Sequence, residues 1–94
     1  MIRSFADAET ERVFHRRFSR KLPGDLQAVA LRKLRMLNNA HALADLRSPP
    51  ANRLEKLTGR RVGQFSIRIN DQWRVCFVWR DGEAYDVEVV DYHR

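Results

Sequence analysis

The chain has few of the residues with which small domains compensate for a small core. It contains one cysteine among 94 residues, so no disulfide can form within it. That residue, Cys76, lies in an apolar stretch, which indicates a buried structural thiol in a reducing compartment. With only three prolines and four glycines, most of the chain is able to form helices and strands. The composition excludes a secreted domain that is held together by disulfides.

Long apolar runs and metal-binding motifs are lacking as well. No stretch approaches the roughly 20 apolar residues that a membrane-spanning helix needs, and the first residues, from Met1 to Phe5, lack the apolar core of a signal peptide. The three histidines are widely separated and no cysteine cluster accompanies them, so we expect neither a metal nor another cofactor. We expect a cytoplasmic protein that does not bind membranes.

Lysine is scarce although the chain is basic. The formal net charge is +6, and arginine supplies nearly all of the excess, with 15 Arg against 3 Lys. Arginine binds phosphate through two parallel hydrogen bonds and stacks on flat rings. This preference favours a nucleic-acid partner, although a solvated basic surface explains the composition equally well.

The spacing of the apolar residues predicts helices first and strands afterwards. Helical spacing covers 7–21, where Asp7 is the expected N-cap and Phe14 and Phe18 share one face, and then 25–39. After these helices the period changes to two. The expected strands are 2–5, 53–57, 65–69, 73–80 and 85–90. This order predicts a single domain, residues 1–94, of the α+β class, with two N-terminal helices packed on one face of a mainly antiparallel sheet.

Alternation along the strands predicts a basic face on this sheet. Phe65 and Val75 are expected to face the helices, which places Arg68 and Arg74 on the opposite, open face. Further cations come from the neighbouring segments: Arg53, Lys56, Arg60 and Arg61. Fixed cations on an uncovered sheet face resemble a docking surface for nucleic acid. A solvated outer face rich in arginine is the alternative.

The chain ends in four polar residues, Asp91, Tyr92, His93 and Arg94, of which the last is supported only by its charge. His93 can donate or accept a proton at neutral pH. Asp91 can orient the ring or act as a base, and Tyr92 can stack on a base or donate a proton. With Arg74 to stabilise charge on a phosphate, this set suits the cleavage of RNA by its own 2′-hydroxyl without a metal. A frayed polar terminus is the alternative, and alternation places Asp91 and His93 on one side of the strand and Tyr92 on the other.

Four stretches in order carry a family resemblance, namely MIRSF at 1–5, LRSPPANRL at 46–54, GQFSIRINDQWR at 63–74 and DYH at 91–93. With them the chain resembles the HigB toxins of bacterial toxin–antitoxin pairs, within the RelE/ParE superfamily. The resemblance implies a small RelE-like α+β toxin that cleaves mRNA in the decoding site of the ribosome without a metal. It also implies neutralisation by a HigA-like helix-turn-helix antitoxin, and contact with operator DNA only through the complex with that antitoxin.

The resemblance further implies the site residues. Asp91, Tyr92 and His93 match the family's C-terminal catalytic cluster, and Arg74 matches an arginine of the superfamily's central strand. On this basis we expect these four residues to be catalytic. The wider set of cations is expected to bind RNA: Arg53, Lys56, Arg60, Arg61 and Arg68.

The chain departs from the family in the loop before the sheet, where some relatives carry His and Lys. Glu55 and Thr58 replace those two residues here. The candidates to supply the missing cation are Lys56, Arg60 and Arg61.

Two functions of other classes also fit the sequence. A ParE-like inhibitor of DNA gyrase on the same fold would use the tail to contact a protein, without catalysis. A basic RNA-binding module would use the arginines for phosphate contacts and would not react. The terminal Asp-Tyr-His favours the nuclease over both.

Overall fold

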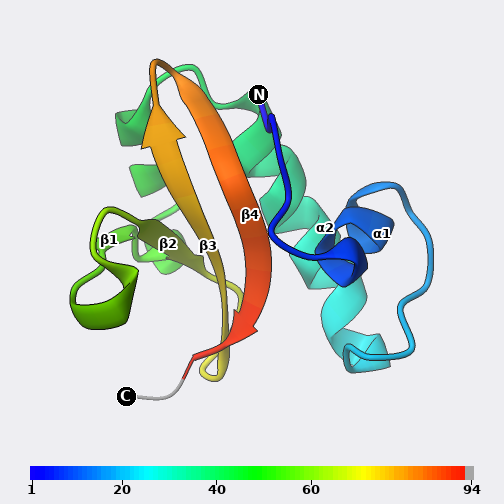
Figure 1. The fold of residues 1–94 in the computed structure, drawn as a ribbon. Helices are drawn as coiled ribbons and strands as arrows, with labels where there is room; N and C mark the ends of the chain where they lie inside the picture. The colour runs from blue at the N-terminus through cyan, green and yellow to red at the C-terminus, as the bar shows by residue number, and fades with distance from the viewer. Residues whose placement is uncertain (93–94) are drawn as a thin grey trace.

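The computed structural model describes residues 1–92 as two helices followed by a sheet (Figure 1). The helices are α1 (Ala8–Phe14) and α2 (Gly24–Asn39), and the strands are β1 (Glu55–Lys56), β2 (Phe65–Arg68), β3 (Trp73–Arg80) and β4 (Glu83–Asp91). The four strands are antiparallel and lie in sequence order. Both helices lie on one side of this sheet, so the predicted α+β arrangement is confirmed. Within the described residues, no helix is long and apolar enough to cross a membrane.

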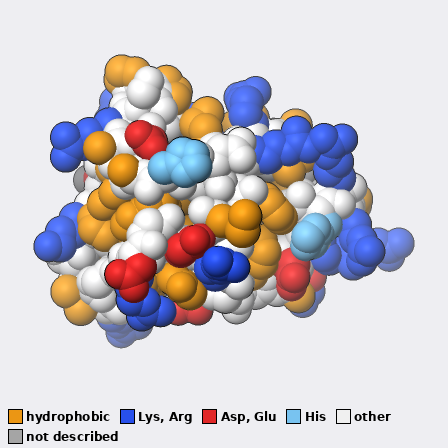
Figure 2. Space-filling view, turned by 90° about the horizontal axis from the view of Figure 1, so that it is seen from above, with side chains coloured by type: hydrophobic (Ala, Val, Ile, Leu, Met, Phe, Trp, Pro, Cys, Tyr) orange, Lys and Arg blue, Asp and Glu red, His pale blue; other side chains and the backbone are white. Residues whose placement is uncertain are grey.

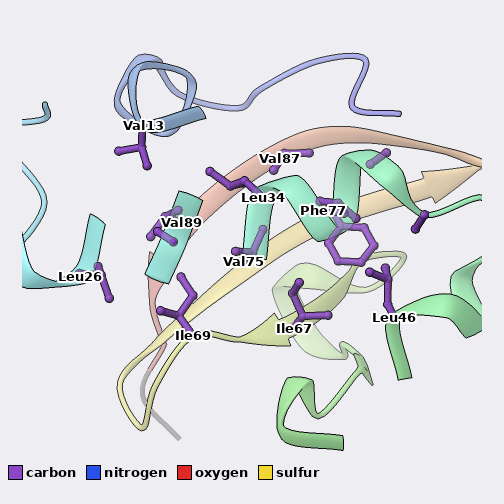
Figure 3. Close-up of a cluster of buried hydrophobic side chains, with 14 residues drawn as sticks. Val13, Leu26, Leu34, Leu46, Ile67, Ile69, Val75, Phe77, Val87 and Val89 are labelled. Atoms are coloured by element: carbon purple, nitrogen blue, oxygen red, sulfur yellow. The ribbon is translucent and has the colours of Figure 1, made fainter. Parts of the chain in front are cut away.

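The hydrophobic core lies between α2 and the sheet. Leu34 and Leu37 of α2 are fully buried, as are Val75 and Phe77 of β3 and Val87 of β4. Figure 3 shows Leu34 among the side chains from β3 and β4. Each such side chain stabilises the fold by roughly 1.5–3 kcal/mol relative to its exposed state. This packing explains why helical spacing in the second predicted helix was a reliable signal.

The prediction of one long first helix is wrong, because α1 ends at Phe14. Two residues later, Arg16 adopts a left-handed φ of 63°. The N–H of Arg17 then bonds to the carbonyl of Arg12 at 2.8 Å, which closes a Schellman-type end. Glycine is usual at the left-handed position, so the sequence carries no stop signal there. Phe18 consequently lies outside the helix and is 64% exposed.

The start of α1 agrees with the sequence. The carboxylate of Asp7 accepts a hydrogen bond from the N–H of Thr10 at 2.6 Å, as an N-cap does. The hydroxyl of Thr10 is buried and accepts a hydrogen bond from the N–H of Val89 at 2.9 Å. The short helix is therefore attached directly to β4.

The N-terminal segment covers the outer edge of β4. Ile2 pairs with Ala84 and Phe5 with Val87, both in parallel orientation. The predicted edge strand at 2–5 is thus present as two isolated bridges. A paired edge offers fewer unsatisfied backbone groups to other chains.

A bulge in β4 decides which of its residues face the helices. Cys76 pairs with Glu88 and Val78 with Tyr85, so two residues of β4 oppose one residue of β3. Asp86 lies within this bulge and has a φ of 52°. The alternation of β4 side chains between the two faces of the sheet is therefore out of step before and after the bulge.

The face of the sheet away from the helices is partly covered, contrary to prediction. The register pairs Arg68 with Arg74, and both alternate with residues of the core, so their placement on this face is confirmed. However, Arg74 is only 8% exposed. The chain turns at Arg53, whose φ is 44°, and the expected strand 53–57 is reduced to β1. Leu57 follows β1 and is buried.

Candidate functional site

A polar cleft of about 270 Å³ lies on the face of the sheet away from the helices. It is lined by Arg53, Glu55, Arg68, Asn70, Asp71, Arg74 and Tyr92. We call it the arginine cleft. The structure therefore brings together four residues that the sequence analysis singled out: Arg53, Arg68, Arg74 and Tyr92. Three of them are cations from three different segments, which is an arrangement suited to an anion.

Arg74 is the most constrained side chain of the arginine cleft. Its Nε donates a hydrogen bond to the hydroxyl of Ser66 at 2.6 Å. Its Nη2 donates to the backbone carbonyl of Arg53, also at 2.6 Å. A guanidinium group is planar, so bonds from two of its nitrogens fix both its position and its plane. Ser66 is itself fully buried, and its side chain is therefore a rigid acceptor.

The electrostatics of the cleft favour a bound phosphate. Arg68 lies directly across the strand pair from Arg74, and like charges in that position repel each other. The guanidinium of Arg68 donates to the carboxylate of Asp71 at 2.5 Å, which offsets part of this repulsion. Asp71 is fully exposed, so its contribution to stability is small. A phosphate that reached the arginines would replace this weak partner by a stronger bidentate one.

The two described residues of the predicted C-terminal cluster, Asp91 and Tyr92, lie on opposite faces of the sheet. Tyr92 lines the arginine cleft, and its N–H donates to the carbonyl of Gln72 at 2.7 Å. Asp91 pairs with Trp73 and alternates with Tyr92, so it belongs to the other face of the sheet. Its carboxylate accepts a hydrogen bond from the amide of Gln72 at 3.0 Å. The predicted catalytic residue His93 lies outside the described residues.

The predicted loop cations do not line the arginine cleft. Arg61 donates to Glu88 at 2.7 Å and to Gln64 at 3.0 Å, and the bond to Glu88 raises the pKa of Arg61. Lys56 pairs with Phe65 and so lies on the opposite side of β1 from Glu55. Arg60 is exposed on the short 3-10 turn Gly59–Arg61. As RNA-binding residues, these three would act outside the cleft.

Sequence reasoning missed three residues that line the cleft, namely Glu55, Asn70 and Asp71. Asn70 and Asp71 fall in the turn between the strands expected at 65–69 and 73–80. Asn70 does form that turn, because its side-chain oxygen accepts from the N–H groups of Gln72 and Trp73. Their position in the sequence could have indicated them, since this turn lies between Arg68 and Arg74, which are both expected on the basic face.

A larger groove of about 460 Å³ lies between α2 and the segment that follows α1. Its apolar lining includes Val13, Phe18 and Leu31, and Arg17 and Arg35 lie beside them. None of the predicted site residues lines it. In the view of Figure 2, basic side chains project at several separate places on the outline, so net charge alone does not locate a site. The smaller cleft is the better candidate because three arginines converge there, of which Arg74 is buried, Arg68 half-buried and Arg53 exposed.

The fold matches that of a chain in a solved structure. The chain superposes on a chain of the YoeB–YefM complex from Staphylococcus aureus with a TM-score of 0.59 and 16% identity. The match covers 100% of this chain and 99% of the other. At this identity the likeness shows the RelE-like fold and nothing more.

The sequence comparisons identify the family. The model for RelE-like HigB toxins of type II toxin–antitoxin systems matches residues 3–93, and the chain therefore belongs to this family. It is 43% identical over 75 residues to the toxin HigB-1 of Vibrio cholerae, across 80% of this chain and 78% of that protein. It is 27% identical over 93 residues to the endoribonuclease HigB of Proteus vulgaris, across 99% and 100% of the two chains.

Proposed function

We propose that this toxin is a ribosome-dependent endoribonuclease and that the arginine cleft holds the phosphate of the bond that is cleaved. The observation that carries the proposal is the cleft itself, in which Arg53, Arg68 and Arg74 meet Tyr92. A relative of the chain is named an endoribonuclease, which supports the same reaction class.

In the proposed chemical step, only groups of the protein and of the RNA react. A base removes the proton of the 2′-hydroxyl, whose oxygen attacks the adjacent phosphorus and displaces the 5′ oxygen. An acid returns a proton to this leaving oxygen, so the products are a 2′,3′-cyclic phosphate and a 5′-hydroxyl. Arg74 and Arg68 would stabilise the extra negative charge of the pentacoordinate phosphorus. Tyr92 and His93 would exchange the protons or stack on a neighbouring base.

Asp91 takes a different part in this proposal. Its place on the other face of the sheet and its bond to Gln72 argue for a supporting role. It would hold the strand end that carries Tyr92 into the cleft. A direct proton transfer by Asp91 would require the end of β4 to rotate so that Asp91 faced the cleft.

We infer three partners for this function. A HigA-like helix-turn-helix antitoxin would neutralise the toxin in the cytoplasm. This is in line with a family of toxin–antitoxin systems and with a structural neighbour that was solved as a complex. The ribosomal decoding site would present the mRNA, because a small open cleft offers little surface to position RNA by itself. Operator DNA would be bound only through the antitoxin.

Mapping of mRNA 5′ ends after brief induction tests the activity. We expect new ends at defined codon positions with the wild type, and a loss of roughly 10²–10³-fold with Arg74→Ala. His93→Ala should also lose cleavage. Arg47→Ala is the matched control, because Arg47 is exposed and does not line the cleft.

Two outcomes would assign another function. Intact transcripts together with DNA damage signalling would indicate a gyrase inhibitor. Salt-sensitive RNA binding without cleavage, even with translating ribosomes, would indicate a binding module. The antitoxin is tested separately, by whether co-expression of an adjacent helix-turn-helix protein restores growth and yields a complex that purifies together.

A further inference from the structure

A buried polar link connects α2 to the backbone beneath the arginine cleft. The ammonium of Lys33 donates to the side-chain oxygen of Asn52 at 2.6 Å. Lys33 is 7% exposed and Asn52 is fully buried. The amide nitrogen of Asn52 donates in turn to the carbonyls of Leu46 at 3.1 Å and Ser48 at 3.3 Å. The side chain of Asn52 thus ties together a helix and two points of the following loop.

The desolvation of the Lys33 ammonium lowers the stability of the fold, which argues that the link has a function. Burial and the nearby positive charges of Arg32 and Arg68 lower the pKa of Lys33. A charged group that is taken out of water destabilises a protein unless it is well paired. An apolar side chain at position 33 could pack against the same loop without this cost. The hydrogen bond between Lys33 and Asn52 is directional and therefore selects one position of the loop. An apolar contact would allow the loop several positions.

The loop position matters because Arg53 follows Asn52 directly. Arg53 is held in the left-handed region, with a φ of 44° and a ψ of 58°. Its carbonyl is thereby aimed at the Nη2 of Arg74, 2.6 Å away. The hydroxyl and the carbonyl of Ser66 accept further bonds from Arg74, at 2.6 and 3.5 Å. One of the short bonds that fix the guanidinium plane therefore depends on the loop that Asn52 anchors.

We propose that Lys33 and Asn52 are positioning residues for RNA cleavage, which hold the Arg53 carbonyl where it orients Arg74 in the cleft. The inference rests on the proposed function, in which Arg74 stabilises the reacting phosphate. Neither positioning residue touches RNA. Because Arg53 and Arg68 would still attract phosphate without them, the effect is on the rate of cleavage and not on binding.

The test compares Asn52→Ala and Lys33→Met with Val13→Ala. Val13 is a core residue of α1, is 3% exposed and takes no part in the link, so its truncation destabilises the fold without removing any bond of Lys33 or Asn52. Cleavage of ribosome-bound mRNA is followed with excess toxin, at a temperature where circular dichroism shows each variant folded. The maximal rate and the toxin concentration at half-saturation are measured separately.

We expect Asn52→Ala to lower the maximal rate by roughly tenfold or more, since small misplacements of a reacting group carry costs of this size. Lys33→Met should lower it less, because Asn52 keeps its bonds to the loop. In both variants the half-saturating toxin concentration should stay within about twofold of the wild-type value. The reason is that the contacts that bind the phosphate equally in the ground state and the transition state are retained. Val13→Ala should keep the wild-type rate.

A second readout needs no RNA. The Nε–H signal of Arg74 in a ¹H–¹⁵N spectrum should exchange slowly in the wild type and in Val13→Ala, and faster in Asn52→Ala. Full cleavage by Asn52→Ala, or an equal loss in Val13→Ala, would overturn the proposal. If Asn52→Ala does not fold, Lys33→Met decides by the same criteria. Full activity of Arg74→Ala would instead refute the proposed function.

Discussion

The segment between α1 and α2 has no regular structure, and the side chain of Gln27 makes three hydrogen bonds to its backbone. Gln27 of α2 accepts a hydrogen bond from the N–H of Ser19 at 2.9 Å and donates one to the carbonyl of the same residue at 2.7 Å. It donates a further bond to the carbonyl of Leu22 at 2.9 Å. Ser19 is fully buried, so water does not readily replace these partners. Gln27→Met keeps the length of the side chain and removes all three bonds.

The expected cost follows from the groups that this change leaves unpaired. A buried donor or acceptor without a partner costs about 1–3 kcal/mol. The N–H and carbonyl of Ser19 are two such groups, so we expect a loss of about 3 kcal/mol in the free energy of unfolding, after some relaxation of the loop. For a domain of this size, that corresponds to a decrease in Tm of roughly 12–24 °C.

Urea denaturation measures this loss, with the fluorescence of Trp73 and Trp79 as the signal. With a slope of about 1–3 kcal/mol per molar urea, the midpoint should fall by roughly 1–3 M. Gln72→Met is the control, because Gln72 is exposed and its change should cost less than about 0.5 kcal/mol. Equal midpoints for the two variants would refute the reasoning that Gln27 holds the segment.

Three further predictions concern titration and catalysis. The pKa of Lys33 is lowered on folding, so between that pKa and the ordinary value of 10.5 the unfolded chain binds more protons. The free energy of unfolding should therefore rise with pH across this window in the wild type more than in Lys33→Met, as urea titrations at several pH values would show. Burial raises the pKa of Cys76 to about 11, so iodoacetamide at pH 8 should alkylate it slowly in the native protein and quickly in urea. Tyr92→Phe should reduce mRNA cleavage more than Asp91→Asn, because only Tyr92 lines the cleft; the reverse order in an end-mapping assay would place Asp91 in the reaction.

The last three strands and the second helix were predictable because local spacing and burial agree there. In β3, apolar residues on the helix side alternate with Arg74 and Cys76, and both faces turned out to be as the alternation indicates. The first helix failed because its end depends on Arg16 in a left-handed conformation, which the sequence does not signal. The basic residues at 16–21 have the pattern of a helix C-terminus, although the helix has already ended at Phe14.

Part of the lining of the candidate site was predictable from the sequence, and its geometry was not. Arg53, Arg68, Arg74 and Tyr92 were selected from the sequence, and they do line one cleft. The expectation of an open face was wrong because the covering loop comes from a segment that local periodicity reads as an ordinary strand. Its actual path depends on contacts made far away in the sequence.

The class of fold, the meander of strands and the chemistry of the available side chains are set by local spacing and composition, and they can be read before the chain is folded. Only the tertiary structure decided that Arg74 is buried and oriented, because its anchors are Ser66 and the Arg53 carbonyl. It also decided that Tyr92 enters the cleft while Asp91 leaves it, because the register of β4 against β3 sets the face of each residue. These features depend on pairings between distant segments, and such pairings exist only once the chain has folded.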